Sequence, residues 1–360
     1  MSYEDNFLTY LKWRGDLSVK DFPFNEVDAL ILSELVYLHF EGIVPELGNE
    51  GGITIREANA KYEKSTAREM LYYKDKENLF DVLAFSPRFA DMTLCNYVST
   101  YDEKAQEQFA AMHVNVTSGF TFIAFRGTDS TVVGWREDFN MTYMMPVPAQ
   151  QSAAEYVDQT VKGLFKKYSI GGHSKGGNLA VYSGVFCNPK IQKKILQIYN
   201  FDGPGFNRKM INDENYKRIE NRISTYVPEQ SIVGLLMEHE EDYKVVESTE
   251  FAVLQHEGFS WVIDRDAFVL VDEVNKYSKT LSVTLKAWLA EMSAAERKAV
   301  VDAFFDVFVN AGINDFMEIV DMDVKMAARL IKEVAKVPQE QRDKVMKLIK
   351  LLIEENTRKK

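Results

Sequence analysis

The chain has 360 residues, of which 46% are hydrophobic and 27% are charged, and it carries two cysteines and a formal net charge of −11. This composition is typical of a folded protein, and it excludes the collagen-like, low-complexity and disulfide-stapled classes. The excess of negative charge argues against a nucleic-acid-binding protein, because such a protein needs a basic face to displace phosphate counterions.

Signals for export and for membrane insertion are missing from the sequence. The chain begins with an acidic stretch, Met1 to Asn6, whereas a secretory signal needs a basic flank and an apolar core. No stretch reaches the roughly 18 consecutive apolar residues that a membrane-spanning helix requires. Cys95 and Cys187 fit a reducing compartment as packed thiols. We therefore expect a cytoplasmic protein without a transmembrane segment.

The spacing of apolar residues is mostly helical up to about residue 90. Residues 26–40 place apolar side chains on one broad face, which is typical of an amphipathic helix. These side chains are Val27, Leu30, Ile31, Leu35 and Leu38. We expect residues 1–90 to form a helical segment that packs on the core of the protein.

Strand patterns begin after residue 90. Short runs of β-branched and aromatic residues predict consecutive strands over 92–99, 109–116 and 120–125. From about residue 150 the pattern alternates, with helices predicted over 153–168 and 177–186 and strands over 169–172, 195–201, 222–227 and 251–254. Such alternation predicts an α/β core over residues 91–277, with a mostly parallel central sheet and helices on both of its faces.

The strand patterns stop after about residue 277, and a helical region is predicted over residues 278–360. A first helix is expected over 280–292, and Ser293 with Glu296 forms a capping box that opens the next one, through Phe308. Two more helices are predicted over 317–337 and 339–353. Pro338 separates them because proline cannot continue a helical hydrogen-bond ladder.

The strongest local signal for chemistry is the segment Gly172-His173-Ser174-Lys175-Gly176. It has the G-x-S-x-G pattern of a nucleophile elbow, a sharp strand-to-helix turn that presents a serine hydroxyl above the edge of a sheet. A short β run comes directly before the pattern, and a helix rich in small residues comes directly after it. Because this is the context that the motif requires, Ser174 is the candidate nucleophile.

A serine hydroxyl is a weak nucleophile, so it needs a base, and in folds with this elbow the chain order is serine, acid, histidine. The chain has five histidines, at positions 39, 113, 173, 239 and 256. Only His239 and His256 follow Ser174 outside the elbow. His239 lies in an acidic stretch, whereas His256 follows a predicted strand, where ligands bind in open α/β sheets. The pattern therefore favours His256 as the base.

The acid of such a triad orients the histidine and stabilises its charged form, so it should lie at a strand end between Ser174 and His256. Asp202 ends the predicted strand 195–201 and begins the rigid turn Asp-Gly-Pro-Gly. Glu229 follows the next predicted strand and is the alternative acid. We favour Asp202 slightly, and both remain candidates.

An oxyanion formed on the substrate needs two hydrogen-bond donors. The backbone N–H of Lys175, directly after the nucleophile, supplies the first. The second is expected from the turn that follows the strand 120–125, where Thr128 offers a backbone N–H and a hydroxyl. Thr128 and Lys175 are therefore the predicted oxyanion residues.

Several segments of the chain resemble one known family. Residues 122–129 (Phe-Ile-Ala-Phe-Arg-Gly-Thr-Asp) and 171–177 (Gly-Gly-His-Ser-Lys-Gly-Gly) look like the two signatures of class 3 lipase-like α/β-hydrolases. Further segments resemble the bacterial Mbeg-like branch of that superfamily, namely residues 10–17, 202–206, 231–234 and 255–261. The resemblance covers nearly the whole chain, including the helical tail. It implies an α/β-hydrolase fold and a serine hydrolase in which Ser174 and His256 occupy the nucleophile and base positions.

These patterns together predict a serine hydrolase that cleaves a carboxylic ester, with lipids among the candidate substrates. A catalytically degenerate scaffold that acts as a binding module, and an acyltransferase, are the alternatives. No sequence pattern supports a nucleotide, a dinucleotide or zinc, so no cofactor and no metal are expected. The expected partner is an ester or lipid-like small molecule, and transient contact with a membrane surface is compatible with the sequence.

Overall fold

The computed structural model describes residues 6–64, 70–129, 131–239, 241–314 and 324–357. Their contacts group the chain into two compact units. The first unit comprises the residues up to 100, together with 109–127 and 149–282. The second comprises residues 101–108, 128–148 and those from 283 onward. The domain boundaries predicted at residues 90 and 277 stay predictions.

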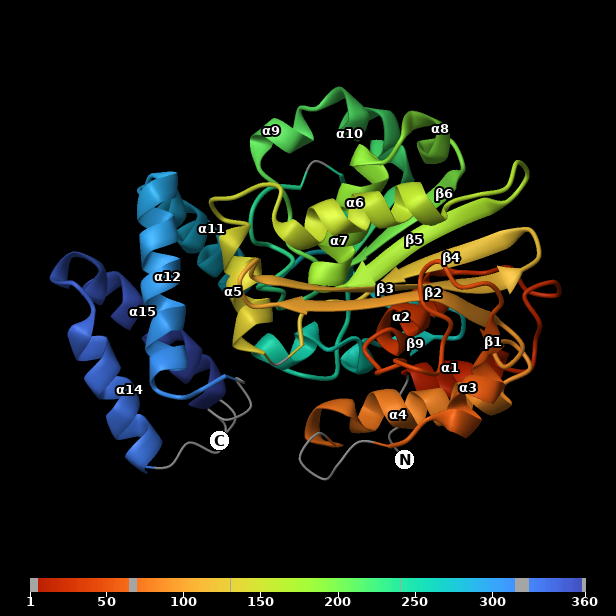
Figure 1. The fold of residues 1–360 in the computed structure, drawn as a ribbon, viewed down its shortest axis with the longest axis horizontal. Coiled ribbons are helices and arrows are strands. Elements are labelled where there is room, and N and C mark those ends of the chain that lie inside the picture. Colours follow the sequence, from red (N-terminus) through yellow and green to blue (C-terminus); the bar gives the residue numbers. More distant parts are fainter. Residues whose placement is uncertain (1–5, 65–69, 130, 240, 315–323, 358–360) are drawn as a thin grey trace. The chain divides into compact units, whose positions relative to one another are not determined.

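The first unit is built on a mostly parallel sheet (Figure 1). Among the described residues, nine strands pair in the order β1-β2-β3-β4-β5-β6-β7-β8-β11. Their bounds are β1 Ile53–Thr54, β2 Thr93–Asp102, β3 Glu107–Thr117, β4 Phe120–Phe125, β5 Lys167–His173, β6 Ile195–Phe201, β7 Ile223–Pro228, β8 Tyr243–Val246 and β11 Leu270–Val271. The strands from β4 to β8 pair in parallel, whereas β1 with β2, β3 with β4, and β8 with β11 are antiparallel. A separate ribbon pairs β9 (Ile263–Asp264) with β10 (Ala267–Phe268).

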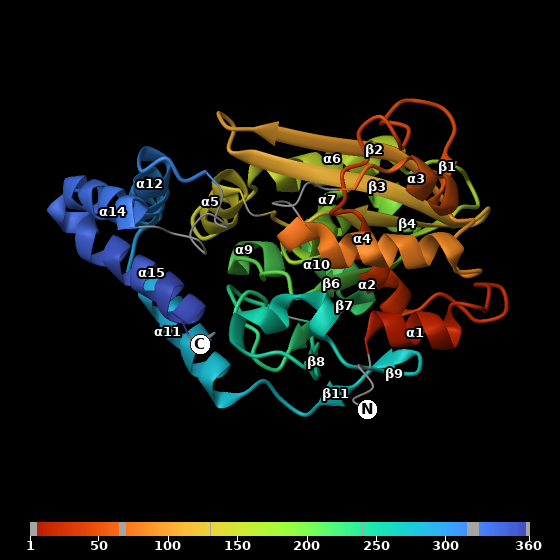
Figure 2. The same ribbon diagram turned by 90° about the horizontal axis from the view of Figure 1, so that it is seen from below.

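Helices cover both faces of this sheet, with α2 and α4 on one side and α6 and α7 on the other (Figure 1). The first group is α1 Phe7–Arg14, α2 Glu26–Leu35, α3 Ile55–Lys61 and α4 Met70–Phe85. The second group is α6 Pro148–Thr160, α7 Lys175–Phe186, α8 Pro189–Gln192, α9 Arg208–Ile211 and α10 Glu214–Ile219. Figure 2 views the molecule from the side of α1, α2 and α4. The predicted class, a mostly parallel α/β sheet with helices on both faces, is confirmed.

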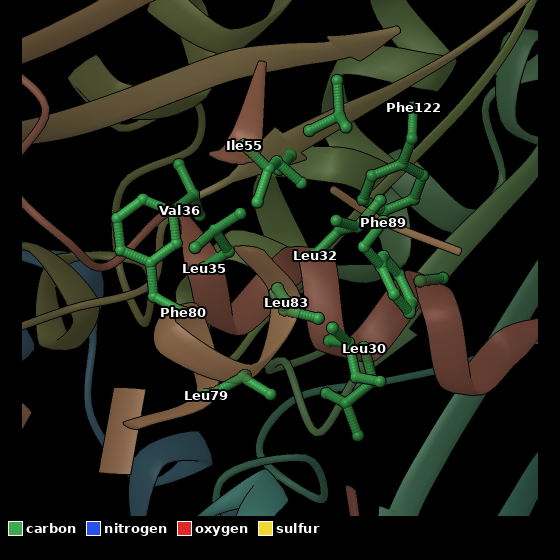
Figure 3. Packing of buried hydrophobic residues seen from close by; sticks show 14 of the residues in the cluster. Leu30, Leu32, Leu35, Val36, Ile55, Leu79, Phe80, Leu83, Phe89 and Phe122 are labelled. Carbon is green, nitrogen blue, oxygen red and sulfur yellow. The ribbon is translucent and has the colours of Figure 1, made fainter. Parts of the chain in front are cut away.

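Helix α2 is the centre of the apolar core on its side of the sheet. A capping box formed by Asn25 and Asp28 opens it, and its apolar side chains are fully buried. Figure 3 shows leucines of α2 packed against Phe80 and Leu83 of α4 and Phe122 of β4. The helix is shorter than the predicted 26–40, because after Leu35 the backbone bonds follow a tighter turn. The residues beyond it are still buried, which explains their apolar pattern.

A buried ion pair involves the first turn of α2. The guanidinium of Arg88 donates from Nε to Asp28 Oδ1 at 2.8 Å and from a terminal nitrogen to Oδ2 at 2.5 Å, and both side chains are fully buried. Tyr10 donates its hydroxyl to the same carboxylate at 2.7 Å. The remaining Arg88 N–H groups donate to the carbonyl groups of Leu17, Phe22 and Pro23. One arginine therefore ties the chain before α2 to the segment after α4.

Two predicted elements of the first unit differ in the structure. The predicted helix 153–168 is confirmed as far as Thr160 and ends there, because the Lys162 N–H bonds to the Tyr168 hydroxyl and the chain then enters β5. The predicted strand 251–254 is instead the start of η2, a 3-10 helix over Ala252–His256. It cannot join the sheet beside β8, because β11 occupies that edge.

The second unit is helical, with α5 Val132–Asn140, α12 Ala294–Asn310, α14 Val324–Lys336, α15 Gln339–Thr357 and most of α11 Lys276–Ala290. The predicted capping box of Ser293 and Glu296 is confirmed. Phe139 of α5 stacks on Phe304 of α12 within its apolar core. The predicted helix 317–337 is confirmed from residue 324 onward, and its first part lies outside the described residues.

In the described part of the chain, no helix combines the length and the apolar character needed to cross a bilayer.

The buried ion pair generates a stability prediction. Asp28→Asn leaves the buried Arg88 charge without its counter-ion, so the free energy of unfolding should fall by about 3–5 kcal/mol. The double variant Asp28→Leu/Arg88→Met removes both charges and should lose less than the single variant. Urea denaturation of the three proteins measures these differences. A single variant within about 1 kcal/mol of the parent would contradict the prediction.

Candidate active site

Ser174 lies in a strained turn between β5 and α7. Its backbone has φ 56° and ψ −132°, a conformation that side-chain-bearing residues rarely adopt. Gly176 is required here, because a Cβ at this position would lie 2.2 Å from the Phe125 carbonyl oxygen. The residues of the G-x-S-x-G pattern therefore form a sharp strand-turn-helix, with Ser174 8% exposed.

Asp202 follows β6, the strand next to β5, and its side chain is fully buried. Its Oδ1 accepts hydrogen bonds from the Ser231 hydroxyl at 2.5 Å and from the Gly234 N–H at 3.1 Å. A Cβ on Gly234 would lie 2.2 Å from Oδ1, so only glycine lets the backbone come this close. One oxygen of the carboxylate is thus fixed by neutral donors, and Oδ2 faces His256.

His256 donates from Nδ1 to Asp202 Oδ2 at 2.6 Å. With the proton of a neutral imidazole on Nδ1, Nε2 is the nitrogen able to accept a proton. The Ser174 N–H donates to the carbonyl of Phe201, directly before Asp202, at 2.8 Å. The rings of His173 and His256 are 4.6 Å apart. The structure therefore brings Ser174, Asp202 and His256 into one neighbourhood at the carboxyl edge of the sheet.

The two competing candidates lie elsewhere. Glu229 follows β7 with its side chain half-buried, and among the described residues no hydrogen bond or ion pair joins its carboxylate to His256. His239 donates from Nε2 to the Gly234 carbonyl at 2.6 Å, and its Nδ1 faces Glu241 at 3.1 Å. Of the carboxylates and histidines weighed in the sequence, Asp202 and His256 are the pair in contact.

His173, inside the elbow, has a role that the sequence did not indicate. Its Nε2 donates to the backbone carbonyl of His256 at 2.6 Å, and its Nδ1 lies 3.2 Å from the Tyr37 hydroxyl. Burial, together with the charge of the nearby His256, lowers the pKa of His173 to about 3. A neutral His173 that carries its proton on Nε2 accepts a hydrogen bond from the Tyr37 hydroxyl at Nδ1. This side chain therefore links the turn after α2 to the segment that carries His256.

A cluster of charged side chains lies beside this link. Lys76 of α4 is 3% exposed, and its Nζ lies 3.6 Å from Glu34 of α2 and 3.5 Å from Glu257. Burial raises the pKa of Glu34 to about 7, although the Lys76 charge opposes this shift. The same Lys76 charge lowers the pKa of Glu257. Because Glu257 directly follows His256, the cluster anchors the irregular segment that holds the imidazole.

The pKa of His256 is raised above the ordinary value for histidine. Burial works against the charged imidazolium, but the hydrogen bond and the charge of Asp202 outweigh it, and Glu257 and Glu34 add to the rise. His256 therefore keeps its second proton to a higher pH than an exposed histidine does.

The two predicted oxyanion residues belong to different units. Lys175 is the first residue of α7, so its backbone lies at the positive end of the helix dipole. Thr128 belongs to the second unit, where its hydroxyl donates to Asp138 Oδ2 at 2.6 Å. Its role as an oxyanion donor stays a prediction. Within the described ranges, no group of three or more histidine, cysteine, aspartate or glutamate side chains could hold a metal ion.

The model of the Mbeg1-like family matches residues 83–306. The chain belongs to the Mbeg1-like family. Ser174, Asp202 and His256 all lie inside the matched range of this Mbeg1-like protein, whereas α2 and most of α4 precede it. A comparison with the curated proteins gives no match.

Solved structures that are similar to the Mbeg1-like protein include three lipases. The crystal structure of M37 lipase is 14% identical, with a TM-score of 0.34 over 59% of this chain and 69% of that chain. The native Rhizomucor miehei lipase propeptide complex is 18% identical, with a TM-score of 0.31 over 44% and 58% of the two chains. A fungal lipase–inhibitor complex, described as a model for interfacial activation, is 15% identical, with a TM-score of 0.35 over 51% and 77%.

The electrostatics of His256 generate a prediction about Glu257. The charge of Glu257 adds to the raised pKa of His256, so Glu257→Gln should lower that pKa. The change should be small, because the Glu257 side chain is 48% exposed and solvent screens its charge. An NMR titration of the histidine ring protons measures this shift. Glu229→Gln is the matched control and should leave the His256 titration unchanged. A pKa that stays constant or rises in Glu257→Gln would contradict the assignment.

Proposed function

We propose that this Mbeg1-like protein is a serine hydrolase that cleaves carboxylic esters through an acyl-enzyme. The observation that carries this proposal is the hydrogen bond from His256 to the buried Asp202, next to an elbow that presents Ser174. A serine, an oriented imidazole and a buried carboxylate at neighbouring strand ends are the groups that acyl transfer needs.

In the proposed reaction, the Ser174 Oγ attacks the ester carbonyl carbon while His256 Nε2 accepts the hydroxyl proton. Collapse of the tetrahedral intermediate breaks the bond to the alcohol, which leaves with the proton from His256. Water then attacks the acyl-serine, His256 accepts its proton, and the carboxylic acid leaves as Ser174 regains its hydrogen. Asp202 keeps the imidazole in the required tautomer and stabilises the imidazolium in both halves of the cycle.

The residues around Asp202 and His256 support the roles assigned to the nucleophile, the base and the acid. The oxyanion is stabilised by the backbone N–H of Lys175 at the start of α7, with Thr128 as the predicted second donor. The raised pKa of His256 means that the neutral base becomes available at higher pH than for an ordinary histidine. The rate of hydrolysis should therefore rise with pH through this pKa.

An acyltransferase would share the first half of this cycle and differ in the acceptor that attacks the acyl-serine. The alternative of a degenerate scaffold lacks a reason to keep His256 oriented by a buried carboxylate. Ester or lipid-like small molecules are the proposed substrates, and a series of p-nitrophenyl esters of rising chain length would define the preferred acyl group.

The nucleophile is tested with Ser174→Ala. Hydrolysis of p-nitrophenyl esters should fall by about 10⁶ in kcat, and labelling by a fluorophosphonate probe should vanish. Ser183→Ala is the matched control, since Ser183 lies on α7 and donates its hydroxyl to the Ala180 carbonyl. Labelling that persists in Ser174→Ala and maps to another serine would overturn the proposal.

The acid is tested by comparing Asp202→Asn with Glu229→Gln. Ser231 and Gly234 would hold the amide oxygen of the new asparagine, so its NH₂ group must face His256 and impose the wrong tautomer. We expect kcat to fall by roughly 10⁴ in Asp202→Asn and by less than about tenfold in Glu229→Gln. Both variants should keep the thermal midpoint of the parent. The opposite ranking would assign the acid to Glu229.

A further inference from the structure

The loop between α6 and β5, residues 161–166, exposes two adjacent apolar side chains. Leu164 is 81% exposed and Phe165 is 87% exposed. These are the highest exposed fractions among the large hydrophobic side chains that the structure describes. Exposed apolar side chains of this size, placed side by side, mark a surface that contacts something other than water.

The loop is held at both ends, so its tip is presented by a fixed backbone. The Tyr168 hydroxyl donates to the Lys162 carbonyl at 2.8 Å and accepts from the Lys162 N–H at 3.2 Å. Lys194 donates from Nζ to the Gly163 carbonyl at 2.8 Å, and the Lys167 N–H donates to the Gly119 carbonyl at 2.9 Å. The exposure of the tip therefore does not come from a loosely attached segment.

Lysines are concentrated in the two stretches of chain that meet at this loop, although the net charge of the whole chain is −11. Residues 161–167 and 189–197 together contain six lysines and no acidic residue. They are Lys162, Lys166, Lys167, Lys190, Lys193 and Lys194. The bond from Lys194 to Gly163 brings the two stretches together. The nearest acidic side chain on α6, Asp158, accepts a hydrogen bond from the Asn188 N–H at 2.7 Å.

We propose that this loop and the α8–β6 turn form a docking surface for an anionic lipid bilayer. Leu164 and Phe165 would enter the boundary between head groups and acyl chains, and the lysines would contact the phosphate groups around them. Lysine suits this role because its apolar stem lies along the interface while its ammonium group stays among hydrated head groups. The basic rim of the apolar tip favours an anionic membrane over a neutral one.

The docking surface and the candidate active site lie at opposite ends of β5. The loop precedes Lys167, the first residue of this strand, and Ser174 follows His173, the last one. β5 has seven residues, so at about 3.3 Å per residue its ends are roughly 20 Å apart. Ser174 therefore lies at the opposite end of β5 from the residues that would enter the bilayer. The surface acts independently of hydrolysis and goes beyond the proposed function.

Vesicle co-sedimentation of the full chain tests the proposal. The protein should bind vesicles that contain phosphatidylglycerol, bind phosphatidylcholine vesicles poorly, and dissociate as the salt concentration rises. Leu164→Ser/Phe165→Ser and Lys190→Glu/Lys193→Glu should each weaken binding about tenfold or more. Phe85→Ser is the matched control, because Phe85 is 76% exposed at the end of α4 and lies near Asp81 and Asp16.

A second measurement reports insertion directly. Cys95 and Cys187 are buried, so a cysteine introduced by Phe165→Cys can be labelled with a fluorophore sensitive to polarity. Its emission should increase on anionic vesicles, and that of labelled Phe85→Cys should not. Equal binding by the loop variants and the parent, or equal emission changes at both labels, would overturn the proposal. Absence of vesicle binding, with dimers that Leu164→Ser/Phe165→Ser dissociates, would assign the surface to a second copy of the chain.

Fluorophosphonate labelling of the loop variants separates the two proposals. The variants should be labelled at the same rate as the parent, because the loop takes no part in the chemistry. Loss of vesicle binding with intact labelling supports the docking surface. Vesicle binding by a protein that no fluorophosphonate labels would keep the docking surface and overturn the serine hydrolase.

Discussion

The hydrogen bond between Asp202 and His256 is the interaction on which the candidate site depends. His256 lies on a short 3-10 helix, so no strand ladder fixes its backbone. Side chains hold this backbone in place instead. His173 donates a hydrogen bond to the His256 carbonyl, and Trp261 donates to the neighbouring Gln255 carbonyl at 2.9 Å. The carboxylate is held in turn by two neutral donors. Hydrogen bonds thus fix both the imidazole, through Asp202, and the irregular backbone that carries it.

Much of this support comes from the N-terminal helices. Glu34 and Tyr37 come from α2 and its C-terminal turn, and Lys76 comes from α4. These residues precede the range that the family model matches. They nevertheless contact His173, which directly precedes Ser174 in the chain, and Glu257, which directly follows His256. The N-terminal helices therefore do more than cover one face of the sheet. The charge of Glu34 adds to the rise that Asp202 causes in the pKa of His256, and Lys76 holds the segment that carries this residue through its ion pair with Glu257.

The parts of the site with a local signature could be predicted from the sequence. The elbow was predictable because the G-x-S-x-G pattern, the β run before it and the helix of small residues after it lie next to one another in the sequence. The alternation of helix and strand patterns predicted the parallel sheet. The strand predicted over 251–254 was wrong, because a β-like pattern carries no information about which strand pairs with β8 at the edge of the sheet. The role of His173 was equally hidden, since it depends on Tyr37, which is 136 positions away in the chain. Nothing local marks Lys76 as a partner of Glu257.

The placement of the basic loop and the elbow at opposite ends of one strand has a practical consequence. A chemical tether at Phe165, the most exposed of the large hydrophobic side chains in the described ranges, would hold the first unit by the end of the sheet farthest from Ser174. A protein immobilised through this position on a bead or a sensor chip would present its proposed catalytic groups to the flowing solution. The same attachment would leave the buried network around His256 untouched, since no residue of that network lies in the loop. Strand β5 therefore provides a natural axis for orienting this protein on a solid support.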